Sequence, residues 1–215
     1  MKKLNMKSHG PNGMLITFCG LDGCGKTTMI NRLKCLFSAL DVPLLLTKQP
    51  TEEMRKNSIF RTYMDQKDHS RYDYRALSLM AASDRIQHSN KVILPALQND
   101  FTVISDRYFY SCLANLRARG YENDMWIYEI AQNIPKPDLA FFLDVSVETA
   151  VERVRSRENE RNRYIDMELQ YRLRDEYIKI CEENGGILIP SDIGINETFE
   201  KIYKYIRFPE ETENE

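Results

Sequence analysis

The sequence contains no long apolar run. No stretch approaches the ~20 consecutive apolar residues that a membrane-spanning helix needs, so we expect no membrane partner. The first ten residues include lysines but lack the apolar core of a secretory signal peptide. We therefore expect residues 1–12 to form a flexible tail on a cytoplasmic protein.

Paired cysteines are also lacking. The five cysteines are odd in number and widely spread, and they form neither a C-x-x-C motif nor a Cys/His spacing typical of metal sites. Reduced thiols in a cytosolic protein fit this pattern best. One of them, Cys24, lies in the glycine-rich loop described below, where we interpret it as a small filler residue rather than an oxidation-sensitive thiol.

Neither sign of charge is in large excess. The formal net charge of −2 and the pI near 6.0 give no overall attraction to nucleic acid or to anionic membranes. The chain has 215 residues, 42% hydrophobic and 29% charged, and it shows no repeat or low-complexity linker. We therefore predict one globular domain over residues 13–208, followed by an acidic disordered tail at 209–215.

The clearest motif is a glycine-rich loop that follows the apolar segment 14–19. Residues 20–28 read G-L-D-G-C-G-K-T-T and match G-x-x-x-x-G-K-[ST], in which glycines bring successive N–H groups around a phosphate. Lys26 would reach the outer phosphate oxygens, and Thr27 would offer a hydroxyl ligand to Mg²⁺. A helix beginning inside the loop would aim its positive end at the anion. The predicted nucleoside triphosphate site consists of Gly20, Gly23, Cys24, Gly25, Lys26, Thr27 and Thr28.

Short apolar segments alternate with helical patterns along the rest of the chain. We expect strands at 14–19, 44–46, 101–105, 139–145 and 187–189, with helices in the intervals between them. This alternation predicts an α/β fold of the P-loop NTPase type, with a five-stranded parallel sheet between two layers of helices. The all-apolar segment 44–46 is of the kind found in strands buried on both faces.

Polar side chains follow three of the expected strands. Asp22, Lys48 and the segment Asp106-Arg107-Tyr108 should meet Lys26 at one edge, because the carboxyl ends of parallel strands lie together. A cluster of arginines interleaved with glutamates follows later in the chain. By itself this cluster would be a solvated helix face, but after a phosphate loop it indicates a mobile flap that neutralises charge during phosphoryl transfer. The arginines are Arg153, Arg155, Arg157, Arg161 and Arg163.

The charges near the expected acceptor favour a phosphate rather than a hydroxyl. A nucleoside hydroxyl needs a carboxylate base, whereas a monophosphate, with a second pKa of about 6, is already largely ionised. Lys48 and Arg107 supply positive charge where a nucleoside kinase would need a base. Glu52 and Glu53 follow closely enough in sequence to leave a nucleoside acceptor open.

These residues resemble those of thymidylate kinases, which belong to the P-loop nucleoside monophosphate kinases, from about residue 13 to 207. The resemblance includes the loop at 20–28, K-Q-P at 48–50 in place of R-E-P, D-R-I-Q-H at 84–88, and I-S-D-R-Y at 104–108 with a serine at 111. It continues through P-D-L-A-F-F-L-D at 137–144, the arginine-rich lid at about 155–165, and the helix from N-R-Y-I-D to D-E-Y over 162–177. The phosphate loop is shared with many enzymes, whereas the two D-R pairs at this distance are much more specific to the family.

The resemblance implies Mg²⁺-dependent transfer of the γ-phosphoryl group of ATP to dTMP, giving dTDP, by a cytoplasmic homodimer. It implies that Asp22 holds the sugar 3′-hydroxyl, that Arg107 and Lys48 lie at the monophosphate, and that Arg85 lies at the base edge. Asp106 would help Thr27 to hold Mg²⁺. The loop has no basic residue beyond Lys26, so the resemblance assigns the transition-state arginine to the lid, as Arg157 with Arg153 in support.

Three residues depart from the family pattern at the acceptor base. Ala81 stands where a phenylalanine usually stacks on thymine, and losing such stacking removes about 1–3 kcal/mol on the scale of nucleic-acid binding. Cys112, after Ser111, replaces a better hydrogen-bonding residue, and Asn115 replaces a tyrosine that often excludes ribose. An enzyme for another or a modified pyrimidine monophosphate is therefore an alternative. A more remote alternative is a non-catalytic nucleotide switch, although D-x-x-G and N-K-x-D motifs are lacking.

Overall fold

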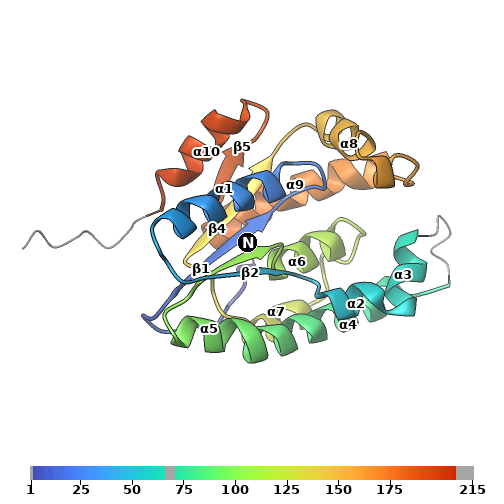
Figure 1. The fold of residues 1–215 in the computed structure, drawn as a ribbon. Coiled ribbons are helices and arrows are strands. Elements are labelled where there is room, and N and C mark those ends of the chain that lie inside the picture. The colour runs from blue at the N-terminus through green and yellow to red at the C-terminus, as the bar shows by residue number, and fades with distance from the viewer. Residues whose placement is uncertain (1, 66–70, 207–215) are drawn as a thin grey trace, which may run out of the picture.

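A single parallel sheet forms the centre of the molecule (Figure 1). The computed structural model describes residues 2–65 and 71–206, so the predicted acidic tail at 209–215 lies outside the described residues. The strand order β2-β3-β1-β4-β5 confirms the predicted five-stranded α/β architecture. The strands are β1 Met14–Cys19, β2 Leu44–Lys48, β3 Thr102–Asp106, β4 Leu139–Asp144 and β5 Ile187–Pro190.

Helices cover both faces of the sheet. Figure 1 shows α1 and α10 side by side, and these two helices contact each other and one face of the sheet. Figure 1 shows α4 and α5 on the opposite side of the sheet from α1 and α10. There α5 packs on β3, and α6 contacts both α4 and α9, while α9 packs on β4 and β5 and also contacts α8. The helices are α1 Lys26–Ala39, α2 Glu52–Lys56, α3 Ser58–Asp65, α4 Tyr74–His88, α5 Leu94–Gln98, α6 Phe109–Arg117, α7 Trp126–Ala131, α8 Val147–Arg155, α9 Met167–Asn184 and α10 Ile195–Tyr203.

Two short helical turns join some of these elements. A π-helical turn, Ser89–Ile93, connects α4 to α5, where Pro95 stands in the first turn because that position needs no backbone N–H donor. A 3₁₀ turn, Glu158–Glu160, lies between α8 and α9 in the predicted lid. Within the described ranges, none of the helices has the length and apolar character required to cross a bilayer.

The strand β2 differs from its prediction. The sequence predicts a strand buried on both faces, but β2 lies at an edge of the sheet, where it pairs with β3, and 38% of Leu46 is exposed. By contrast, the central strand β1 is almost wholly buried. An all-apolar run of three residues therefore does not distinguish an edge strand from a central one, because only the neighbouring strands decide that position.

The N-terminal segment packs on the domain. The sequence predicts a flexible tail for residues 1–12, whereas the structure buries Leu4, which is only 4% exposed, and its backbone N–H donates to Asn184 Oδ1 at 2.9 Å. Lys7 exchanges backbone hydrogen bonds with Ile134 and Lys136 at 2.9 and 2.7 Å. The prediction failed because a single apolar side chain and a short β-bridge produce no periodic signal.

We expect the Leu4→Ala substitution to lower the free energy of unfolding by about 2 kcal/mol, because it leaves a cavity in the core. Urea denaturation followed by circular dichroism measures this change. The exposed neighbour Lys3 provides the matched control, and Lys3→Ala should change the free energy of unfolding by less than about 0.5 kcal/mol. Equal stability of the Leu4→Ala and Lys3→Ala proteins would show that the segment contributes nothing to folding.

Candidate active site

The glycine-rich loop links β1 to α1. Gly25 caps α1 in the left-handed conformation, with φ 95°, so the helix begins at Lys26 with its N-terminus directed at the loop. A Cβ atom on Gly23 would clash with the carbonyl oxygen of Ala150 in α8, which explains why this position requires glycine. Thr27 and Thr28 are exposed in the first turn of α1. The loop therefore has the backbone shape that the motif predicts.

Lys26 turns back over the loop. Its ammonium group donates to the carbonyl oxygens of Leu21 and Gly20 at 2.7 and 3.2 Å, and the residue is only 6% exposed. Cys24 Sγ lies 3.6 Å from the same Nζ atom, beneath the loop. A buried ammonium group needs such partners, because desolvation without hydrogen bonds is costly. The loop thus holds a positive charge ready for an anion.

Asp22 joins two arginines that come from opposite sides of the site. Its Oδ1 atom pairs with Arg107 Nη2, and its Oδ2 atom lies 3.2 Å from Arg163 Nη2. Arg107 Nη1 also donates to Tyr177 Oη at 3.2 Å and to the Gly20 carbonyl oxygen at 3.4 Å. The same Gly20 oxygen therefore accepts from both Lys26 and Arg107. The structure brings these two predicted cations to one point, as the parallel-sheet argument requires.

The backbone of Arg107 directs its side chain to that point. Arg107 follows β3 with φ 68°, a left-handed conformation that costs energy for a residue other than glycine. Two hydrogen bonds hold the turn: Arg107 N–H donates to the Phe18 carbonyl oxygen at 2.8 Å, and Ser105 Oγ donates to the Arg107 carbonyl oxygen at 2.7 Å. Strained backbone of this kind is often found at functional sites.

The charges of the site support one another. The Arg107 guanidinium, aided by Lys26 and Arg163, holds the pKa of Asp22 well below its usual range even though burial opposes this shift. Burial disfavours the charged form of Arg107, but attraction by Asp22, Tyr177 and Asp106 raises its pKa overall. Asp22 is therefore an anion, and Arg107 a cation, throughout the physiological pH range.

Asp106 has the chemistry of a Mg²⁺ ligand. Its Oδ2 atom lies 3.0 Å from Lys48 Nζ, whereas Oδ1 is buried and has no hydrogen-bond partner among the described residues. Mg²⁺ is usually held by one or two carboxylates together with phosphate oxygens rather than by a full protein cage. The described ranges contain no group of three or more acidic, histidine or cysteine side chains that could hold a metal ion. One free carboxylate oxygen, with the exposed hydroxyl of Thr27, fits such a site.

Arg55 is a cation near the site that the sequence analysis missed. Its Nε atom donates to the Pro50 carbonyl oxygen at 2.8 Å, and Nη2 lies 3.4 Å from the Gln49 oxygen. Burial lowers its pKa, and repulsion from Arg107 and Arg85 adds to that shift. Arg55 lies in a polar segment without a motif, and no sequence signal marks it.

The predicted base-reading residues lie on α4 and α6. Arg85 is 3% exposed and donates to the Ala81 carbonyl oxygen at 2.8 Å, while its Nε atom is buried without a described partner. The carboxylate of Asp84, the preceding residue, accepts from Thr51. Cys112 Sγ lies 3.4 Å from Ser78 Oγ.

Two further predicted residues lie on α6, and their side chains have partners within the protein. Ser111 is buried, with Oγ 3.9 Å from Cys19 Sγ. Asn115 donates to the Ser111 carbonyl oxygen at 2.9 Å and accepts from Arg119 at 2.8 Å. The contact between α4 and α6 thus brings these residues to one region.

The lid arginines differ in position. Arg153 donates to the Ser191 carbonyl oxygen at 3.2 and 3.3 Å and lies 3.5 Å from the Gly23 oxygen, so it ties the loop to the end of β5. Arg157 is exposed. The arginine that reaches Asp22 is Arg163, which the sequence analysis noted in the cluster but did not select. Its place in the N-R-Y-I-D motif was the available signal.

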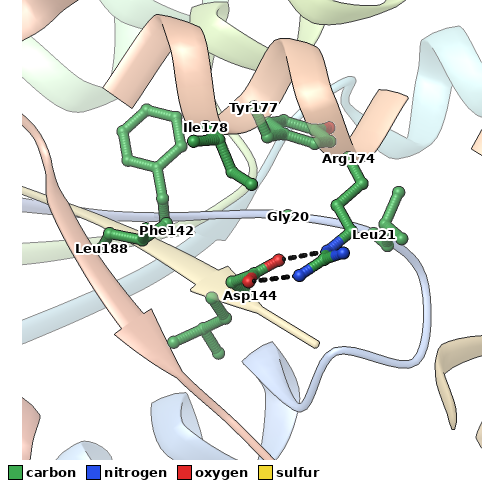
Figure 2. A pocket seen from close by; sticks show the side chains of 9 residues that line it. Gly20, Leu21, Phe142, Asp144, Arg174, Tyr177, Ile178 and Leu188 are labelled. Atoms are coloured by element: carbon green, nitrogen blue, oxygen red, sulfur yellow. Dashed lines mark hydrogen bonds and ion pairs between the residues drawn. The ribbon is translucent and has the colours of Figure 1, made fainter. Parts of the chain in front are cut away.

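A second ion pair supports the loop from behind (Figure 2). Arg174 reaches from α9 to Asp144 at the end of β4, with two hydrogen bonds of 2.7 and 2.8 Å, beside Gly20 and Leu21. Tyr177 lies one turn further along α9. Its hydroxyl oxygen accepts a hydrogen bond from Arg107 Nη1. This bidentate pair fixes the helix that follows the lid against the phosphate loop.

A family model and individual related proteins point to the same family. A family model described as thymidylate kinase matches residues 18–202. A probable thymidylate kinase of Pyrococcus horikoshii is 38% identical over 172 residues, covering 79% of this chain and 83% of the relative. One from Pyrococcus abyssi is 39% identical over 179 residues with the same coverage. A thymidylate kinase of Sulfurihydrogenibium sp. is 31% identical over 183 residues, covering 84% of this chain and 89% of the relative.

We expect the Asp22→Asn substitution to flatten the dependence of stability on pH. Asp22 has a depressed pKa in the folded protein, so its contribution is present above the unfolded value of about 3.9 and is lost as pH falls below it. Since the Asp22 side chain is 42% exposed, the contribution should be on the order of 1 kcal/mol. Urea denaturation at pH 6 and at pH 3 measures the effect.

Between these two pH values the wild-type protein should lose about 1 kcal/mol more than Asp22→Asn. The exposed residue Asp41 is the matched control, because Asp41→Asn should follow the wild-type curve. Parallel curves for the wild type and Asp22→Asn would contradict the assigned ion pairs.

Proposed function

The chain belongs to the thymidylate kinase family, and we propose that it transfers the γ-phosphoryl group of Mg²⁺-ATP to dTMP with the residues gathered around Lys26 and Arg107. The observation that supports this most strongly is the shared Gly20 carbonyl oxygen, which lies 3.2 Å from Lys26 Nζ and 3.4 Å from Arg107 Nη1. One cation belongs to the triphosphate loop and the other to the proposed acceptor site. A phosphoryl group therefore has a short path between them.

The donor half of the site consists of the loop and the first turn of α1. We propose that the loop N–H groups and Lys26 bind the phosphates of ATP, with Thr27 and Asp106 holding Mg²⁺. When bound, Mg²⁺ neutralises charge on the phosphate oxygens. Lys26 adds a fixed positive charge from a largely buried position, where electrostatic interactions are stronger than in water.

The acceptor half depends on an exchange of partners. We propose that the monophosphate takes the Arg107 guanidinium from Asp22, and that the released carboxylate then accepts from the sugar 3′-hydroxyl. Lys48 and Arg55 add positive charge nearby. The acceptor oxygen is ionised, so no catalytic base is required. Glu52 and Glu53, which left a nucleoside acceptor open, are exposed on α2, and Glu52 pairs with Lys56 at 2.6 Å.

The lid arginines have separate proposed roles. Arg157, on the exposed part of the lid, is the proposed transition-state cation, and Arg153 supports it by holding the loop. Arg163 closes the lid on the acceptor through Asp22. A homodimeric state and a cytoplasmic location stay predictions from the family resemblance. Since the family consists of kinases, the switch alternative is not supported.

We expect purified protein with ATP, Mg²⁺ and dTMP to form ADP and dTDP, and Lys26→Ala or Arg107→Ala to lower kcat/KM by at least about 10³-fold. Product chromatography and a coupled assay for ADP measure these rates. Far-UV circular dichroism establishes whether each variant is folded. Lys34, exposed on the same helix as Lys26, is the matched control, and Lys34→Ala should keep wild-type turnover. Full activity in a folded Lys26→Ala or Arg107→Ala protein would contradict the assigned roles.

The two lid arginines should respond differently to substitution. We expect Arg157→Ala to lower kcat by about 10³-fold with little change in KM, because a transition-state cation contributes mainly to the chemical step. Arg163→Ala should mainly raise the KM for dTMP, because it removes a contact that closes the lid on the acceptor side. Steady-state kinetics with varied dTMP separates the two effects. If instead Arg163→Ala mainly lowered kcat and Arg157→Ala mainly raised the KM for dTMP, the roles assigned to the two arginines would have to be exchanged.

A further inference from the structure

We infer that Tyr177 is a positioning residue for the acceptor arginine, because its hydroxyl group keeps the Arg107 guanidinium in place when Asp22 releases it. This inference rests on the proposed function, since it assumes that the monophosphate replaces Asp22 at Arg107. Tyr177 acts through Arg107 and not on the reacting atoms. The D-E-Y segment at 175–177 contributes to the family resemblance, but the motif by itself assigns no role to the tyrosine.

The Arg107 guanidinium has three hydrogen-bond partners among the described residues. Its Nη2 atom pairs with Asp22 Oδ1, whereas Nη1 donates to Tyr177 Oη at 3.2 Å and to the Gly20 carbonyl oxygen at 3.4 Å. In the proposed exchange, the monophosphate takes the place of the Asp22 carboxylate. Tyr177 and Gly20 are the two partners that then remain, and both hold the same nitrogen atom.

The partners of Arg107 differ in charge. The Asp22 carboxylate is an anion that competes with a phosphate, whereas the Tyr177 hydroxyl is neutral. Burial raises the pKa of Tyr177, although the Arg107 cation opposes this shift. A neutral acceptor fixes the guanidinium without cancelling its charge. Because a guanidinium has five N–H donors, a bond to Tyr177 leaves others free for phosphate oxygens.

Tyr177 is itself held by two contacts. Its side chain is largely buried, and its ring packs edge-on against Phe142 of β4, with the ring centroids 6.4 Å apart. One turn earlier on α9, Arg174 forms its bidentate pair with Asp144 (Figure 2). Residues three positions apart lie on the same face of a helix. The hydroxyl group is thus presented to Arg107 from a rigid support, as a positioning group requires.

The lid reaches the same ion pair from its other end. Arg163 lies 3.2 Å from Asp22 Oδ2, and α9 begins shortly after it, at Met167. Arg163 therefore contacts the carboxylate of the pair, while Tyr177 contacts the guanidinium. When the pair separates in the proposed exchange, each charged group keeps one contact to this continuous segment of the chain. The segment would hold both halves of the acceptor site while the monophosphate enters.

The Tyr177→Phe substitution tests this role, because it removes the hydroxyl group and keeps the ring. We expect the KM and the Kd for dTMP each to rise about tenfold, because Arg107 loses a hydrogen bond. The KM for ATP should change by less than about twofold, since the proposed donor site does not use this bond. Steady-state kinetics and isothermal titration calorimetry measure these constants. A general loss of stability would not act on one substrate alone.

Tyr110 offers a matched control. It is as deeply buried as Tyr177, and its ring centroid lies 5.3 Å from that of the same Phe142. Tyr110→Phe therefore also removes a hydroxyl group from a tyrosine packed on this ring, and it should keep the wild-type KM for dTMP. Urea denaturation compares the stability of the two variants. Equal increases in the KM for dTMP would show that packing, and not the bond to Arg107, is responsible, and would overturn the inference.

A double-mutant cycle tests whether Tyr177 acts through Arg107. In the Arg107→Ala protein the hydroxyl group has no guanidinium to hold. Adding Tyr177→Phe to that protein should therefore leave the Kd for dTMP unchanged within about twofold. A further loss of about tenfold, as large as that expected in the wild-type background, would show that the two residues act independently and would overturn the inference.

The results separate this inference from the proposed function. If the wild type makes dTDP and Tyr177→Phe keeps its KM for dTMP, or raises the KM for ATP equally, the inference fails and the proposed function stands. If the wild type does not phosphorylate dTMP, the proposed function fails and the inference fails with it.

Discussion

The rest of the site depends on the ion pairs that the Asp22 carboxylate forms. It faces Arg107, which follows β3, and Arg163 of the lid, and Lys26 also lowers its pKa. Without a nucleotide, these cations would repel one another in a partly buried space, where charge interactions are stronger than in water. One negative charge therefore keeps the cations together. Its position in the loop ties the geometry of the proposed acceptor side to that of the proposed triphosphate side.

The order of the strands makes this arrangement possible. β1 and β3 are neighbours with Phe18 opposite Asp106, so the residues that follow both strands leave the sheet at the same level. The Arg107 N–H bonds to the Phe18 carbonyl oxygen, which brings the arginine beside the start of the loop. On the far side of β1, the β4 residue Asp144 and its partner Arg174 fix α9, which carries Tyr177 to Arg107. The two strands that flank β1 thus position the site from both sides.

The sequence was sufficient to predict the strands and the loop, but not which segments pack against one another in three dimensions. The five strands, the phosphate loop and the meeting of Lys26 with Arg107 follow from periodicity, from a motif and from the geometry of parallel sheets. The edge position of β2, the docking of Leu4 and the burial of Arg85 depend on which segments become neighbours in three dimensions. Arg55 lies in a segment without periodicity or motif, so only the structure places it near Arg107. The roles proposed for the lid arginines depend on a conformation that sequence patterns do not encode.

The pairing of Asp22 with Arg107 also bears on which molecules the site rejects. A nucleoside without a phosphate has no anion to exchange for the carboxylate, so its entry would leave the arginine in its existing pair and the sugar without an acceptor. The proposed exchange of partners would therefore disfavour the unphosphorylated precursor, even though its base and sugar match those of the substrate. Under that proposal, the requirement for entry is an electric charge rather than a shape.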